Sequence, residues 1–185
     1  MSKQTITRKG TFDSGHRVMN ERMKCYNLHG HTYLYELTFE FDSMKSIGYA
    51  LDFKEVKRVG CQWIDDYLDH GFIANPNDHE CIGAANATGS KVWLMGLNGR
   101  DYCNPTAENI AKEIFLAMEI LFESHPQLRI SLIRLYETPN CYTECILDSI
   151  TDEERLSWLK INEKLVRDYA KEKGMVEYDD RLVEV

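Results

Sequence analysis

The chain has 185 residues, with 22 Lys or Arg and 30 Asp or Glu, which gives a formal net charge of −8. This length predicts a single domain, and the 43% of hydrophobic residues can supply its core. The acidic balance argues against nucleic acid or an anionic membrane as a partner, because both attract basic surfaces. No apolar stretch approaches the roughly 20 residues that span a bilayer, and no secretory signal is visible, so a cytoplasmic location is expected.

The first half of the chain predicts two strands and a helix. Residues 5–14 mix Thr, Ile and Phe with polar residues and predict a strand, and residues 13–28 predict a long polar loop. The aromatic, partly alternating residues 31–41 predict a second strand, which residues 48–51 are expected to extend or pair with. Apolar residues recur at helical spacing over residues 53–68, so this segment predicts a helix.

The second half of the chain is less regular at its start. Residues 71–104 contain several glycines and only one strand-like run, at residues 91–97. A helix is predicted over residues 105–122, and residues 129–137 and 141–147 predict a β-hairpin.

The end of the chain predicts a charged helix. Thr151 and Glu154 have the spacing of a capping box, and the helix that they open is expected to run to about Lys173 and to end at Gly174. Its expected apolar stripe consists of Trp158, Ile161, Leu165 and Tyr169. The order of elements as a whole is typical of an α+β fold with antiparallel strand pairing.

Histidines recur near the ends of the first two predicted strands. His29 and His31 are two residues apart, so an extended backbone points both imidazoles to the same side of the sheet. His16 follows the first strand, which is the natural pairing partner of the second. Three converging imidazoles would form a zinc site with an open fourth position, the arrangement of catalytic zinc. The alternative is a chance His-x-His pattern on a surface strand.

Cys25 lies in the same polar loop, four residues before His29. It could close the zinc site as a fourth, structural ligand, or act as a thiol on a molecule bound there. The neighbouring Arg22 and Lys24 would favour its thiolate form. The six cysteines of the chain include no CxxC pair, so reduced thiols are expected and a four-thiolate zinc site is not.

Three further positions carry acidic or acid–base side chains. The Asp69-His70 pair could relay a proton, although a histidine after a helix is more often a cap. Glu108 lies at the start of a predicted helix, where a carboxylate usually interacts with the helix N-terminus. Glu137 ends an apolar strand and needs a partner, and the edge of a heterocycle with two parallel N–H donors would suit it.

Six short segments carry a resemblance to a known family. They are Thr11-Phe-Asp-Ser-Gly-His16, Lys24-Cys-Tyr-Asn-Leu-His-Gly-His31, Leu51-Asp-Phe53, Leu68-Asp-His70, Pro105-Thr-Ala-Glu-Asn109 and Tyr136-Glu-Thr138. In this order they resemble the 6-pyruvoyl-tetrahydropterin synthase / 6-carboxy-tetrahydropterin synthase family, over about residues 5 to 147. Each segment alone is a weak signal, whereas six in order are specific.

The resemblance implies the tunnelling fold, in which an antiparallel sheet carries two helices on one face and subunit sheets join into an oligomeric barrel. Trimers of this fold commonly pair, so a homohexamer with active sites at subunit interfaces is expected. The implied Zn²⁺ ligands are His16, His29 and His31. The other implied roles are proton transfer by Cys25, Asp69 and His70, and pterin binding by Glu137 with support from Thr106 and Glu108.

One spacing separates branches of this family. Three residues lie between Cys25 and His29, which resembles the bacterial 6-carboxy branch, whereas the animal 6-pyruvoyl branch has a longer spacer. The implied reaction converts 7,8-dihydroneopterin triphosphate to 6-carboxy-5,6,7,8-tetrahydropterin, acetaldehyde and triphosphate, a step toward 7-deazaguanine compounds such as queuosine. From their loop position, Lys24, Arg22 and Arg17 are candidates to contact the triphosphate, and the alternative is that they are solvated surface charges.

Two regions depart from compact family members. An insertion over about residues 73–104 follows Asp69-His70 directly, and residues 149–185 are expected to form a helical appendage to a synthase domain over residues 1–148. Two other functions are alternatives. One is a 6-pyruvoyl-type elimination of triphosphate without carbon–carbon cleavage, and the other is a non-catalytic zinc-stabilised module in which Cys25 completes the metal shell.

Overall fold

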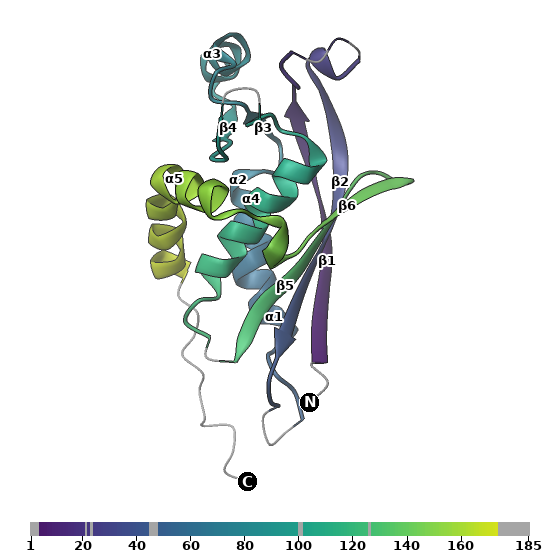
Figure 1. Ribbon diagram of the computed structural model, residues 1–185, viewed down its shortest axis with the longest axis vertical. Coiled ribbons are helices and arrows are strands. Elements are labelled where there is room, and N and C mark those ends of the chain that lie inside the picture. Colours follow the sequence, from purple (N-terminus) through teal and green to yellow (C-terminus); the bar gives the residue numbers. More distant parts are fainter. Residues whose placement is uncertain are drawn as a thin grey trace.

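The computed structural model describes residues 4–20, 22, 24–44, 48–99, 102–125 and 127–173. One layer is a curled six-stranded sheet in the order β4-β3-β1-β2-β5-β6, and helices cover one of its faces (Figure 1). The strands are β1 (Gln4–His16), β2 (His29–Phe41), β3 (Gly71–Ala74), β4 (Lys91–Leu94), β5 (Leu128–Thr138) and β6 (Cys141–Cys145). The chain therefore has the α+β architecture that the sequence predicts.

Strand pairing is antiparallel in the centre of the sheet and parallel at one edge. β1 pairs with β2, β2 with β5, and β5 with β6, all antiparallel. β3 runs parallel to β1, and β4 runs parallel to β3, so the expectation of purely antiparallel pairing is wrong. Parallel neighbours need a crossover, and α3 (His79–Ala87) supplies it between β3 and β4. None of the side chains of α3 is buried, so the sequence has no apolar stripe from which this helix could be predicted.

Two boundaries at the start of the chain differ from the sequence expectation. β1 continues to His16, so the polar loop before β2 is shorter than predicted and contains a single 3-10 turn over Lys24–Tyr26. Residues 48–51 form bends and pair with no strand. The long β1–β2 pairing brings His16 directly opposite His29, which places both at the same end of the sheet.

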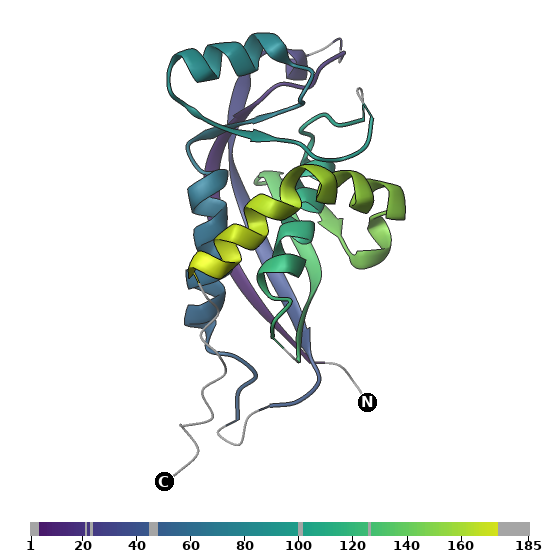
Figure 2. The same cartoon turned by 90° about the vertical axis from the view of Figure 1, so that its left-hand side faces the viewer.

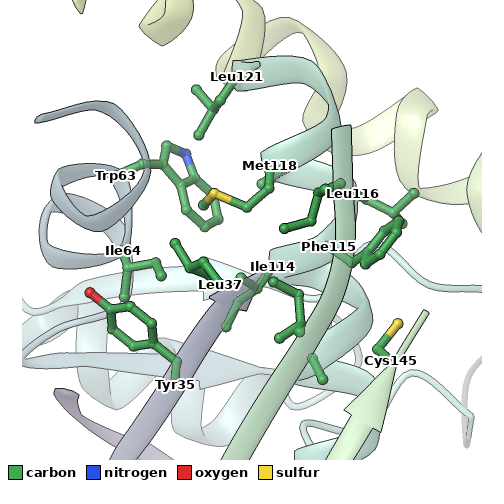
Figure 3. Close-up of a cluster of buried hydrophobic side chains, with 14 of the residues drawn as sticks. Tyr35, Leu37, Trp63, Ile64, Ile114, Phe115, Leu116, Met118, Leu121 and Cys145 are labelled. Atoms are coloured by element: carbon green, nitrogen blue, oxygen red, sulfur yellow. The ribbon is translucent and has the colours of Figure 1, made fainter. Parts of the chain in front are cut away.

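Two helices pack side by side on the sheet. The first combines α1 (Phe53–Val56), a π-helical segment over Lys57–Cys61 and α2 (Gln62–Tyr67), and the second is α4 (Ala107–Leu121). A Cβ atom at Gly60 would lie 3.0 Å from the sulfur of Met118 on α4, so a larger residue here would require the Met118 side chain to shift. The side chains of Leu37, Trp63 and Met118 meet in the core between the sheet and both helices (Figure 3).

A third helix, α5 (Asp152–Lys173), crosses the outside of this helical layer (Figure 2). It begins with the predicted capping box. The N–H of Glu154 donates to Thr151 Oγ1 at 3.2 Å, and the N–H of Thr151 donates to the Glu154 carboxylate at 2.8 Å. The predicted end of this helix at Gly174 lies outside the described residues. Among the described residues, no helix combines the length and the apolar character needed to cross a membrane.

The inner face of α5 differs from the predicted stripe. Trp158 and Tyr169 are buried as expected, but Ile161 and Leu165 are 50% and 40% exposed. Asn162 and Val166 take the inner positions instead. The surface against which α5 packs is partly polar. The face of α5 that is buried there therefore differs from its predicted apolar stripe.

The polar part of this interface is the Glu113 carboxyl group on α4. It is fully buried and accepts hydrogen bonds from the indole N–H groups of Trp93 at 3.1 Å and Trp158 at 2.6 Å, and from the backbone N–H of Gly96 at 2.6 Å. Burial raises its pKa to about 7, although these donors act in the opposite direction. One side chain thereby ties together α4, α5 and the segment around β4.

Candidate metal centre and active site

Three histidine side chains converge where β1 ends and β2 begins. The pairing of the two strands sets His16 opposite His29 and Ser14 opposite His31, so all three rings stand on the face covered by helices. The ring centroids are 4.5 Å (His16–His29), 5.2 Å (His16–His31) and 5.0 Å (His29–His31) apart. Each ring offers one nitrogen as a possible metal ligand, and these three nitrogens all lie within 4.8 Å of one another.

Backbone carbonyls orient two of these rings. His16 Nδ1 lies 2.6 Å from the Pro105 carbonyl oxygen, and His29 Nδ1 lies 2.7 Å from that of Asn27. If Nδ1 donates in both rings, each Nε2 keeps its lone pair for a metal. The Nε2 of His16 is buried and makes no hydrogen bond within the described part of the chain.

The electrostatics of the cluster also suit a metal. Burial lowers the pKa of His16 to about 4, and the rings of His29 and His31 add to this, although the Pro105 carbonyl opposes it. His16 is therefore neutral at neutral pH, which is the form of imidazole that binds a metal. Three converging imidazoles, one of them with a buried and unsatisfied Nε2, fit a divalent cation such as zinc.

Glu137 faces the same cluster from the end of β5. Its Oε1 atom lies 3.9 Å from the Nε2 atoms of both His16 and His31, which is beyond hydrogen-bond distance. Its side chain is 31% exposed, so the carboxylate also reaches solvent. Glu137 therefore lies beside the histidine cluster, and its expected role as a pterin anchor stays a prediction.

Cys25 lies outside the histidine cluster. It occupies the exposed 3-10 turn before β2, and its thiol is free. Among the described residues, the group of ligand atoms within 4.8 Å of one another contains the three histidines without Cys25. This arrangement favours the hypothesis that Cys25 acts as a thiol on a bound molecule. It is less compatible with the alternative hypothesis that Cys25 is a fourth metal ligand.

The basic residues of this loop differ in their surroundings. Lys24 and Arg22 are exposed. The Arg17 guanidinium is paired with the buried Asp78, whose side chain also caps α3, and it reaches Glu80 at 3.4 Å. Arg17 therefore fastens the insertion to the end of β1 and is less available for a triphosphate than Lys24 is.

Asp69 and His70 form a pair at a different place, beside β1. Asp69 accepts hydrogen bonds from His70 Nδ1 at 2.6 Å and from the backbone N–H of Asp13 at 2.8 Å. Burial opposes ionisation of Asp69, but these two donors outweigh it and lower its pKa, and the carboxylate in turn raises the pKa of His70. The sequence did not single out Asp13, which shares this cluster and is exposed.

The position of this pair separates it from the histidine cluster. Asp13 alternates along β1 with the buried Phe12 and Ser14, so its side chain stands on the outer face of the sheet, opposite to that of His16. His70 is exposed and has a positive φ of 52°, an uncommon backbone conformation that often marks functional positions. A single chain thus presents Asp69 and His70 outward.

The start of α4 lies next to His16. Thr106 is its N-cap, and Thr106 Oγ1 accepts a hydrogen bond from the Asn109 N–H at 3.4 Å. The preceding residue, Pro105, supplies the carbonyl that orients His16. Thr106 is therefore close to the site, while Glu108 is exposed in the first turn and has no described contact with the histidines.

One residue of the site was missed in the sequence. Tyr33 is completely buried, and its ring centroid lies 6.0 Å from that of His16 and 5.6 Å from that of His31. The signal was present, because Tyr33 follows His31 by two residues on the same strand and so shares its face.

Comparison with known proteins connects this geometry to a family. Residues 5–146 match the family described as 6-pyruvoyl tetrahydropterin synthase. Proteins named 6-carboxy-5,6,7,8-tetrahydropterin synthase from Rickettsia felis and Haemophilus influenzae are 38% identical over 144 residues and 33% identical over 145 residues. Each of these alignments covers 75% of this chain and 96% of the relative.

Solved structures agree on the fold. An uncharacterized protein from Wolinella succinogenes superposes with a TM-score of 0.63 at 20% identity, covering 80% of this chain and 99% of that one. The 6-pyruvoyl tetrahydropterin synthase of Caenorhabditis elegans gives a TM-score of 0.55 at 19% identity, covering 79% and 96%. The family match and the relatives above 30% identity carry the assignment: this chain belongs to the 6-pyruvoyl tetrahydropterin synthase family.

Proposed function

We propose that this protein is a zinc-dependent enzyme that converts 7,8-dihydroneopterin triphosphate to 6-carboxy-5,6,7,8-tetrahydropterin, with release of acetaldehyde and triphosphate. The observation that carries the proposal is the convergence of His16, His29 and His31 beside Glu137, in a chain whose relatives are named 6-carboxy-5,6,7,8-tetrahydropterin synthase. By the family resemblance, we place the reaction in the cytoplasm, on a route to 7-deazaguanine compounds.

The three histidines would hold Zn²⁺ through nitrogen atoms that no hydrogen bond occupies. When bound, the metal would supply Lewis acidity at the open side of the cluster. Glu137 would accept the two parallel N–H groups of the pterin edge and so fix the heterocycle against the histidines. Thr106 and Glu108 would support this pocket from the start of α4, and Lys24 would meet the triphosphate from the loop.

The remaining residues would move protons. The Cys25 thiolate would remove a proton from the substrate side chain. His70 would deliver or accept the second proton, and the hydrogen bond from its ring to Asp69 favours the protonated form that can deliver one. Triphosphate would leave by elimination, and one water molecule would be taken up as the side chain is cleaved and the two-carbon fragment is released as acetaldehyde.

These residues would meet only in an oligomer. Cys25 lies in the loop before β2, whereas Asp69 and His70 face outward beside β1. A homohexamer built as a dimer of trimers, with the subunit sheets joined into a barrel, would bring the outward pair of one subunit to the histidine cluster of another. The exposure of His70 supports this arrangement.

The decisive experiment is incubation of the zinc-loaded protein with 7,8-dihydroneopterin triphosphate, followed by mass identification of the pterin and assay of acetaldehyde. The proposal predicts 6-carboxy-5,6,7,8-tetrahydropterin together with acetaldehyde. Triphosphate released without acetaldehyde would indicate a 6-pyruvoyl-type reaction. A protein that binds zinc through nitrogen and sulfur, as counted by X-ray absorption, and turns over no substrate would be a zinc-stabilised module.

A further inference from the structure

The hydroxyl group of Tyr33 is buried at the candidate site without a hydrogen-bond partner. Tyr33 is 0% exposed, and its oxygen makes no hydrogen bond within the described part of the chain. Leaving such a group unpaired in a protein interior costs free energy, so unpaired hydroxyls are rare and call for an explanation. The hydroxyl of Tyr169, by contrast, is paired with Asp66 at 3.0 Å.

The ring of Tyr33 is held in place from two directions. It stacks on Phe12, its partner across β1 and β2, with centroids 4.9 Å apart and planes 15° from parallel. The edges of the His16 and His31 rings contact it from the metal side. With the ring fixed in this way, the hydroxyl has little freedom to seek a distant partner.

Glu137 is a neighbour of Tyr33 across the sheet and offers a carboxylate as an acceptor. The β2–β5 pairing ends with Leu34 opposite Tyr136, and the next residues of the two strands are Tyr33 and Glu137. Their side chains project to the same face as those of Leu37 and Leu135, which are both 0% exposed. A tyrosine hydroxyl carries its proton at neutral pH and can donate to a carboxylate.

We propose that Tyr33 is a positioning residue for substrate binding, because its hydroxyl donates to the Glu137 carboxylate when that carboxylate holds the N–H edge of a heterocycle. This inference rests on the proposed function and adds a residue to it. Direct contact between the hydroxyl and the substrate is not proposed, since the oxygen has no solvent-accessible surface and the surrounding side chains cover it. The inferred bond needs the Glu137 side chain to turn toward the hydroxyl, and this side chain is 31% exposed.

The test compares Tyr33→Phe with Tyr35→Phe, a matched change two residues along the same strand. Tyr33→Phe should raise both the KM for 7,8-dihydroneopterin triphosphate and the Kd for 7,8-dihydroneopterin about 10-fold, as expected for loss of a hydrogen bond to a charged acceptor. Its kcat and zinc content should stay at wild-type values, and its melting temperature should not fall, because within the described part of the chain the hydroxyl has no partner to lose. Tyr35→Phe should leave KM and Kd unchanged, because it removes a buried hydroxyl from the same face of the same strand, but from a ring that has no contact with the described histidine rings.

A double-mutant cycle tests whether Tyr33 acts through Glu137. In a Glu137→Ala background, Tyr33→Phe should have no further effect on the Kd for 7,8-dihydroneopterin. An equal effect in both backgrounds, a loss of zinc from Tyr33→Phe, or an unchanged Kd in the single variant would each overturn the inference.

The Kd measurement needs no turnover, so it separates this inference from the proposed function. A wild-type protein that binds 7,8-dihydroneopterin and releases no acetaldehyde from the triphosphate substrate would refute the reaction while the cycle still decides the role of Tyr33. A wild-type protein that binds no pterin would overturn both.

Discussion

At the scale of single residues, the proposed roles divide the site into side chains that would hold a metal and side chains that would act beside it. The Nδ1 atoms of His16 and His29 contact the carbonyl oxygens of Pro105 and Asn27, so each Nε2 keeps its lone pair for a ligand if Nδ1 donates. Cys25 has no place in that cluster. Substitutions at the two kinds of position should therefore separate metal binding from turnover.

Cys25→Ala should keep the zinc and lose most of its turnover, about 10²–10⁴-fold, because it removes a proton-transfer group and no ligand. His29→Ala should lose the zinc. Metal content by atomic emission and initial rates with 7,8-dihydroneopterin triphosphate measure both effects. Cys141→Ala is the control, because Cys141 is also a free, exposed cysteine but lies on β6. Zinc loss from Cys25→Ala would show that Cys25 is a zinc ligand. Full zinc retention by His29→Ala would refute the proposed zinc site.

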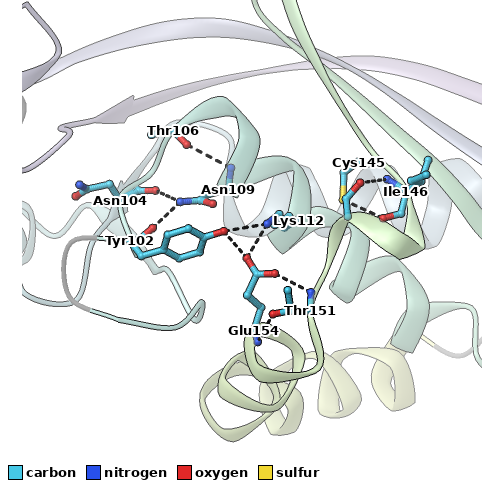
Figure 4. Close-up of polar contacts among 10 residues, drawn as sticks. Tyr102, Asn104, Thr106, Asn109, Lys112, Cys145, Ile146, Thr151 and Glu154 are labelled. Carbon is cyan, nitrogen blue, oxygen red and sulfur yellow. Dashed lines mark hydrogen bonds and ion pairs between the residues drawn. The ribbon is translucent and has the colours of Figure 1, made fainter.

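At the scale of elements, α5 is fastened at its first turn by a small polar network (Figure 4). The Glu154 carboxylate accepts from Lys112 Nζ at 2.6 Å, from the Tyr102 hydroxyl at 2.7 Å and from the Thr151 N–H at 2.8 Å. Burial alone would raise the pKa of Glu154, but these donors outweigh it and lower the pKa to about 2. The ionised form of Glu154 is thus favoured by folding.

Glu154→Gln should therefore destabilise the protein at pH 7 by roughly 1–3 kcal/mol, since the amide replaces a charged acceptor. The contribution of Glu154 is present in full above its unfolded pKa near 4.5 and is lost as the pH falls from there toward 2. Urea unfolding at pH 7 and at pH 2.5 should show a difference between variant and wild type that shrinks at the lower pH. Glu153 is an exposed neighbour in the same turn, so Glu153→Gln should have the same free energy of unfolding as wild type at both pH values. A pH-independent difference would contradict this account.

The helices and strands differ in how well local sequence patterns predict them. The capping box of Thr151 and Glu154 and the aromatic run of β2 were readable, because they depend on neighbours in the chain. The buried face of α5 could not be predicted from the sequence. Asn162 points inward and donates hydrogen bonds to Glu113 and to the Leu94 carbonyl, and both residues are distant in sequence. α3 was missed for a related reason, since a helix with no buried side chain leaves no apolar period.

At the scale of the whole molecule, the chain presents two clusters of titratable side chains on opposite faces of the sheet. The histidine cluster with Glu137 stands on the helix-covered face, and Asp69 with His70 stands outward beside Asp13. We propose that symmetry between identical subunits joins them. The division into a synthase domain over residues 1–148 and an appended helix also stays a proposal, which the family match over residues 5–146 supports.

Mixing two inactive variants tests the shared site. Cys25→Ala and His70→Ala, co-refolded in equal amounts, should regain activity in about a quarter of their sites, because some interfaces then pair an intact Cys25 with an intact His70. Cys25→Ala mixed with His29→Ala should regain none, since both changes fall in one subunit's half of the site. Light scattering confirms that each mixture has the size of the wild-type oligomer. No recovery in the first mixture would place the whole proton-transfer set in a single subunit.

The sequence by itself determined the histidine pattern, the long central strands and the family, because alternation, capping and motif order are local properties of the chain. It also indicated Glu137, whose carboxylate ends an apolar strand. Only the tertiary structure decided that Cys25 lies outside the cluster, that Arg17 is engaged by Asp78, and that Tyr33 is buried without a partner. These outcomes depend on contacts between residues far apart in the chain, and no local pattern encodes which distant group satisfies a buried polar atom.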